Sequence, residues 1–120
     1  MTESRTIQFE AIGTHWQIDI HDALSPDTLR GIFANVRRRI EEFEATYSRF
    51  RDGTLVDQMA HKGGVYSLPP DGKMLFDMYE TLYRVTRGAV TPLIGNTLVE
   101  AGYDKSYSLR VGEMHAPPRW

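Results

Sequence analysis

The segment from Thr86 to Asp104 holds the residues whose types and spacing could do chemistry. Gly88 can take a positive φ and let a ligand approach the main chain. Thr91-Pro92 predicts an extended-to-turn geometry, and Gly95-Asn96, at the start of a short helix, would leave amide donors for an anion. Spacing alone also fits a plainer alternative, in which Gly88 is a helix C-cap and the proline a stop signal.

Short catalytic motifs are absent from the sequence. Its four histidines are scattered without metal-ligand spacing, and there is no nucleophile elbow, Walker loop or GxGxxG fingerprint. With no cysteine, the chain has no disulfides, thiolate zinc sites or cysteine nucleophiles. We therefore predict no catalytic and no metal-binding residue in this chain.

Composition predicts one ordinary soluble domain over residues 1–120. Hydrophobic residues make up 41% and charged residues 25%, enough for a real core. The net charge of −2 gives no footprint for nucleic acid. The basic run at 37–39 is followed by Glu41, Glu42 and Glu44 on the same predicted helix, which indicates a salt-bridged, solvated face.

Membrane and export signals are missing as well. The first ten residues lack an apolar stretch, and no run of about 18 apolar residues occurs, so we expect neither a leader nor a membrane span. As written, the chain is expected to be cytoplasmic.

Periodicity predicts an α+β fold. Two extended runs flank Gly13-Thr14 and indicate a β-hairpin over residues 6–20. Ser25 caps a long amphipathic helix that reaches Tyr47, and Thr54 caps a short one. A second long helix follows Asp71, with methionines, leucines and tyrosines expected in the core. Brief strands at 65–68 and 106–111 would complete a mixed sheet packed against the two long helices.

Three blocks carry a family resemblance over nearly the whole chain. They are FEAIGTHWQI at 9–18, FEATYSRFRDGTLVDQM at 43–59 and TRGAVTPLIGNTLVEAGY at 86–103. In this order they resemble the F-x-x-M-G-T-x-W-x-I hairpin, the F/M-S-x-Y/F-x-x-x-S-x-L segment and the T-x-G-A-F-D-P loop of ApbE-type FAD:protein FMN transferases, also called thiamine biosynthesis lipoproteins.

The resemblance implies a flavin site. Ile12, where the family usually has methionine, would lie against the flavin, and Phe50 would be its aromatic stacking platform; a core anchor is the alternative reading of Phe50. Ala89, Val90 and Thr91 would border the FAD. Thr91 stands where aspartate is commonest, so a hydroxyl replaces a carboxylate there.

The implied activity is the splitting of the FAD pyrophosphate with the help of magnesium and transfer of FMN to a threonine or serine of an acceptor protein. In the family, the metal-binding and catalytic groups lie in a later part of the sequence that this chain does not contain. We therefore expect the N-terminal portion of a transferase, inactive alone. Two alternatives stay open: a non-catalytic flavin-binding module and an α+β interaction domain.

Overall fold

The computed structural model describes residues 5–120. The chain consists of two compact units, Met1–Gln58 and Met59–Trp120, whose boundary lies within its second helix. The fold class is α+β, as predicted, with two strands and four α-helices in the described residues. None of these helices is both long and apolar enough to cross a membrane. The single domain over residues 1–120 stays a prediction.

The first unit begins with the predicted β-hairpin. Strands β1 (Thr6–Ala11) and β2 (Thr14–Asp19) pair antiparallel, with Phe9 opposite Trp16. The turn consists of Ile12 and Gly13, both at positive φ (52° and 68°), as a two-residue loop between twisted strands requires. The turn is thus one residue earlier than the predicted Gly13-Thr14, because the β-branched Thr14 joins the strand.

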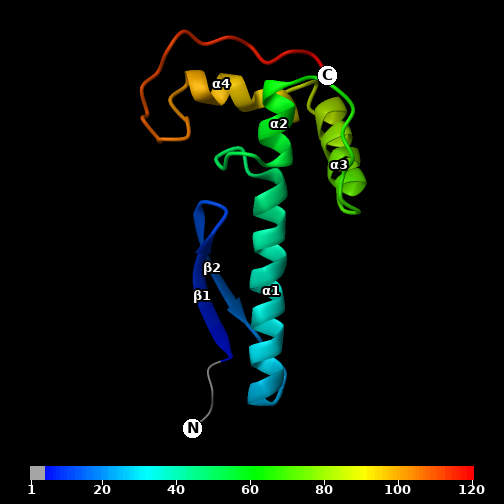
Figure 1. Ribbon diagram of the computed structural model, residues 1–120, viewed down its shortest axis with the longest axis vertical. Helices are drawn as coiled ribbons and strands as arrows, with labels where there is room; N and C mark the ends of the chain where they lie inside the picture. Colours follow the sequence, from blue (N-terminus) through cyan, green and yellow to red (C-terminus); the bar gives the residue numbers. More distant parts are fainter. Residues whose placement is uncertain (1–4) are drawn as a thin grey trace. The chain divides into compact units, whose positions relative to one another are not determined.

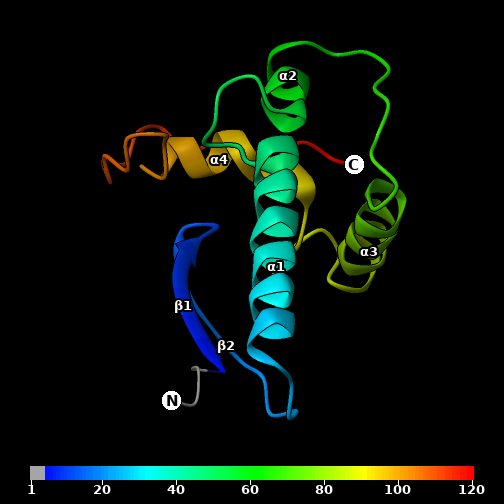
Figure 2. The same cartoon turned by 60° about the horizontal axis from the view of Figure 1, so that its bottom comes forward.

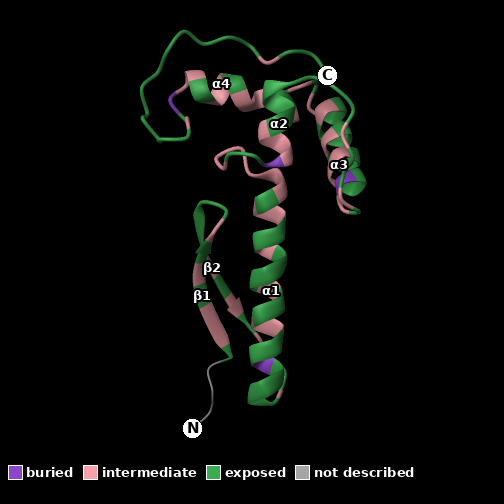
Figure 3. Ribbon diagram, viewed as in Figure 1, coloured by how far each residue is buried: buried purple, intermediate pink, exposed green. Residues whose placement is uncertain are grey.

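Helix α1 (Pro26–Tyr47) lies alongside the hairpin in both views (Figure 1, Figure 2). Ser25 caps it as predicted: its hydroxyl oxygen accepts from the Thr28 N–H, and Pro26 occupies the first helical position. Leu29, on the first turn of α1, is 3% exposed. It is the only large hydrophobic residue that is buried within residues 5–120. All other positions on α1 are exposed or half-buried (Figure 3).

Helix α2 (Leu55–His61) begins after the polar loop that follows α1, as the sequence predicts. Thr54 is 4% exposed, and its hydroxyl oxygen accepts from the Asp57 N–H at 3.0 Å while its proton goes to the Ser48 carbonyl at 2.7 Å. One side chain therefore starts α2 and closes the loop onto the end of α1.

The second unit contains α3 (Gly72–Val85), the 3-10 turn η1 (Pro92–Ile94) and α4 (Gly95–Glu100). The strands expected at 65–68 and 106–111 do not form. Val65 and Val111 are exposed, and Tyr107 and Leu109 have positive φ, which breaks an extended run. The sheet in the described residues is consequently two-stranded and antiparallel rather than mixed.

The apolar stripe of α3 was expected in a core, and the structure differs. Met74 is 69% exposed, and Met78, Leu82 and Val85 are exposed as well. Within the second unit neither η1 nor α4 packs extensively against α3, and of the positions predicted for the core Leu75, Tyr79 and Tyr83 are half-buried. The composition predicted a real core, but a hydrophobic face needs a facing layer to bury it, and the described elements provide little of one.

Candidate functional site

Ile12 lies at the hairpin turn in a strained and fixed conformation. A β-branched residue at φ 52° is unusual, since the left-handed region costs L-residues about 1–2 kcal/mol. Its N–H donates to Glu44 Oε1 of α1 at 3.1 Å, and its side chain is exposed. A hollow of about 390 Å³ surrounds the turn, lined by Glu10, Ala11, Ile12, Gly13, Thr14, His15 and Glu44.

Glu44 also holds the loop that follows α1. Its Oε2 accepts from Arg51 Nη2 at 3.1 Å, and Arg51 donates two further bonds to Glu41 at 2.7 and 3.0 Å. Hydrogen bonds from Arg51, together with its charge, lower the pKa of the Glu41 carboxyl, and Glu41 raises the pKa of Arg51. The three residues form one ionic network between α1 and the loop.

Phe50 lies in that loop, one residue before Arg51. Its N–H donates to Ser48 Oγ at 3.2 Å, and its ring is half-buried. The guanidinium carbon of Arg49 lies 4.1 Å from the ring centroid, within the range of a cation–π contact. Two of the predicted flavin contacts, Ile12 and Phe50, therefore lie in one unit, on segments that both connect to Glu44.

Ala89, Val90 and Thr91 lie in the other unit, where their polar groups have local partners. The Ala89 and Val90 N–H groups donate to the carbonyl and the hydroxyl of Thr86, at 3.2 and 3.0 Å. Thr91 is buried, and its hydroxyl caps η1 by accepting from the Leu93 N–H at 3.2 Å. The N–H groups of the two residues before Thr91 are thus hydrogen-bonded within the loop.

Gly88 takes the plainer of its two predicted roles. It has φ 82°, and its N–H donates to the Tyr83 carbonyl at 2.8 Å, five residues back, which is the geometry of a glycine closing a helix C-terminus. A Cβ at this position would lie 3.4 Å from the Tyr83 ring. The Gly88 N–H is therefore used to cap the C-terminus of α3, as the plainer alternative predicted.

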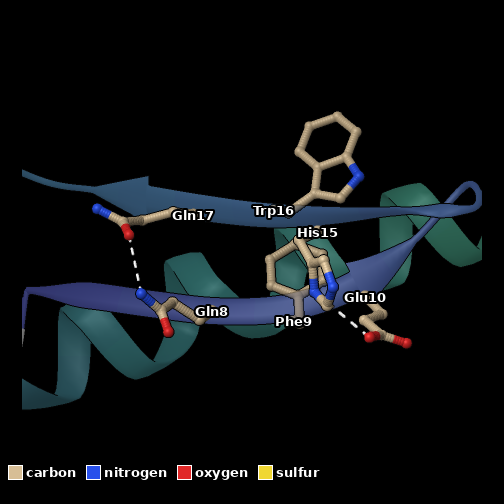
Figure 4. A pocket seen from close by; sticks show the side chains of 6 residues that line it. All are labelled: Gln8, Phe9, Glu10, His15, Trp16 and Gln17. Atoms are coloured by element: carbon tan, nitrogen blue, oxygen red, sulfur yellow. Dashed lines mark hydrogen bonds and ion pairs between the residues drawn. The ribbon is translucent and has the colours of Figure 1, made fainter.

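A second hollow, of about 410 Å³, follows the hairpin strands (Figure 4). Across the strands the Gln8 amide donates to Gln17 Oε1 at 2.8 Å, and His15 Nδ1 lies 3.3 Å from Glu10 Oε1 (Figure 4). The Trp16 indole N–H donates to the Ala11 carbonyl at 2.9 Å, so the polar edge of this ring is satisfied within the hairpin.

Asp104 is the most perturbed carboxylate of the second unit. Its oxygens accept from the side chains and backbone N–H groups of Ser106 and Ser108, which lowers its pKa to about 2. These donors lie two and four residues from Asp104, so the lowered pKa is a property of this turn. In residues 5–120, no three His, Asp or Glu side chains are grouped to hold a metal ion.

Arg49, Glu44 and Arg51 were not among the site residues predicted from the sequence. The acidic residues of α1 were expected on a solvated face with the basic run at 37–39, and the Arg38–Glu42 pair at 3.3 Å agrees with that. Glu41 and Glu44 instead pair with Arg51, ten and seven residues later. The sequence feature that could have pointed to these contacts is the arginine on each side of Phe50.

Comparisons of the chain with protein families, with curated proteins and with solved structures found no match.

Proposed function

We propose that this chain is a flavin-binding part of an FMN transferase of the ApbE type, without transferase activity of its own. The ordered resemblance of three blocks motivates the proposal. The observation that supports it best is the bridge through Glu44, which joins the turn carrying Ile12 to the loop carrying Phe50. Two segments that precede and follow α1 in the sequence are thereby held as one assembly.

The residues of this assembly fit a flavin in their chemistry. Phe50 offers an aromatic surface for a flat heteroaromatic ring, Ile12 offers an exposed apolar side chain, and Arg49 carries a positive charge suited to phosphate. FAD, when bound, supplies the pyrophosphate whose cleavage releases FMN for transfer. The proposed role of this chain is to hold the flavin ring. The groups with which the family binds magnesium are not among the matched positions.

The test is a titration that follows flavin fluorescence. Addition of the wild-type chain should change FAD emission, because the flavin ring moves from water onto a protein surface. Phe50→Ala should abolish this change, and Phe50→Tyr, which keeps an aromatic surface, should retain flavin binding. Tyr107→Ala, which removes an exposed aromatic ring of the second unit, is the matched control and should leave the change intact. Unchanged FAD emission at high wild-type concentration would contradict the proposal.

Transfer activity needs a separate test. Mass spectrometry of an acceptor peptide incubated with FAD, magnesium and this chain should show no FMN-sized addition. An FMN-sized addition would contradict the proposed lack of activity, but it would not contradict the proposed flavin binding.

An interaction domain is the second candidate function. The exposed stripe of Met74, Met78 and Val85 on α3 favours it, since clustered exposed apolar side chains often mark contact surfaces. If wild-type protein leaves FAD emission unchanged, this candidate takes precedence.

A further inference from the structure

Helix α3 carries an exposed row of side chains with the spacing of a helix-pairing seam. Met74, Met78, Thr81 and Val85 are separated by four, three and four residues, the repeat that keeps one line of side chains against a facing helix. All four are exposed. The Thr81 hydroxyl donates to the Asp77 carbonyl at 3.0 Å, so its polar group is satisfied within the helix and its methyl group can enter an apolar contact. We call these four residues the α3 seam.

Two opposite charges border the α3 seam on one side. Asp77 and Arg84 are seven residues apart, each directly before a seam residue, and both are exposed. Asp77 Oδ2 accepts from Lys73 Nζ, and its Oδ1 has no partner within residues 5–120. In the same part of the chain the Arg84 guanidinium has neither a hydrogen bond nor an ion pair. One carboxylate oxygen and one arginine are therefore available to a partner that covers the seam.

A second copy of α3, running antiparallel, matches both the seam and the charges. When Met78 lies opposite Thr81 of the second copy, Met74 lies opposite Val85, so the seam faces itself. The same register places Asp77 beside Arg84 of the second copy, and twofold symmetry repeats this pair. A parallel copy would instead place an apolar leucine, Leu82, beside Asp77. Only the antiparallel arrangement therefore neutralises both charges.

We propose that the α3 seam is a self-association surface, on which α3 of a second copy of this chain docks antiparallel with Asp77 and Arg84 paired across the interface. This inference goes beyond flavin binding and does not rest on it. On the other side of the seam, Leu82 and the half-buried Leu75 of the two copies would adjoin and add apolar contact. A pair of 14-residue helices buries less area than a standard stable interface, so the expected dimer is weak and forms in concentrated solution.

The first experiment measures the molar mass of the 120-residue protein by sedimentation equilibrium over a series of concentrations. Arg84→Glu places two carboxylates side by side at both symmetric positions and should raise the dimer dissociation constant about tenfold. Asp77→Arg combined with Arg84→Glu exchanges the two charges and should restore association. Arg110→Glu, which reverses an exposed arginine elsewhere in the second unit, is the matched control and should leave the dissociation constant unchanged.

The second experiment tests the direction of the two helices through disulfide formation, since the chain has no cysteine of its own. Met74→Cys protein and Val85→Cys protein are mixed in a glutathione redox buffer, and intact mass distinguishes the mixed disulfide from the two like-with-like disulfides. Antiparallel pairing places the two introduced thiols opposite each other, so the mixed disulfide should exceed its statistical share. Parallel pairing would favour the like-with-like products.

The results that would overturn this inference are distinct from those that bear on flavin binding. A wild-type protein that is monomeric at every concentration would overturn it. So would a dimer that Arg84→Glu does not weaken, a dimer that the charge exchange does not restore, or disulfides in statistical proportion. Circular dichroism checks that each variant is folded. Replacement of Arg84 removes no side-chain hydrogen bond or ion pair within residues 5–120, so that variant is expected to fold.

Discussion

Ile12 and Glu44 are joined by a hydrogen bond that links a hairpin turn to the last turns of a 22-residue helix. The Ile12 N–H donates to Glu44 Oε1 at 3.1 Å across 32 residues of sequence. The other carboxylate oxygen accepts from Arg51. One acidic side chain therefore sets the position of the strained turn and of the loop that carries Phe50.

Glu44→Ala should destabilise the first unit. It removes the acceptor of the Ile12 N–H, and we expect the free energy of unfolding to fall by about 1 kcal/mol, the usual contribution of one hydrogen bond. Urea unfolding measures the change. Glu42→Ala, on the exposed side of the same helix, is the control and should stay within about 0.5 kcal/mol of wild type. Equal losses in the two variants would argue against the bridge.

Ile12→Gly should stabilise the protein, in contrast to most substitutions of large apolar residues. Glycine adopts φ 52° without the steric cost that isoleucine bears, and the Ile12 side chain is 47% exposed, so little burial is lost. We expect a gain of up to about 1 kcal/mol by urea unfolding. Ile18→Gly, in strand β2, is the control with the opposite sign. A loss of stability in Ile12→Gly would show that the Ile12 side chain has packing contacts that outweigh the strain.

Thr54→Ala should cost about 1–2 kcal/mol of unfolding free energy. It removes both the cap of α2 and the donor to the Ser48 carbonyl, at a site only 4% exposed. Thr54→Ser keeps the hydroxyl and should lose much less. If the serine variant were as unstable as the alanine variant, the methyl group rather than the hydroxyl would be the stabilising part.

Asp104 should give the stability of the second unit a pH dependence in acid. Its folded-state pKa of about 2 lies below the ordinary value of about 3.9, so ionised Asp104 stabilises the folded state above that ordinary value. This contribution is lost as the pH falls from about 4 to about 2. Chemical unfolding of wild type and Asp104→Asn at a series of pH values measures it, and the variant should have a flatter profile over that range.

A double variant, Ser106→Ala with Ser108→Ala, isolates the cause of this shift. It keeps the carboxylate and removes the hydroxyl donors, so it should also flatten the acid profile. An unchanged profile in the double variant would mean that the backbone N–H groups alone lower the pKa.

Local chemistry in the sequence was sufficient to predict several elements. Ser25 followed by proline began α1, Thr54 began α2, and Gly88 ended α3, because caps depend on neighbours within a few residues. The hairpin followed from alternation, with its turn shifted by one residue. The strands expected at 65–68 and 106–111 failed because a strand needs a partner, and alternation or β-propensity does not supply one.

In the candidate site, too, some features follow from the sequence and others only from the tertiary structure. The sequence by itself determined that Phe50 is an aromatic residue between two arginines and that Ile12 precedes a glycine in a hairpin turn. Only the tertiary structure decided that Arg51 pairs with Glu41 and Glu44, and that Glu44 reaches the Ile12 N–H. The physical reason is distance: these partners are separated by up to 32 residues, and their contacts arise only when hairpin, helix and loop come together.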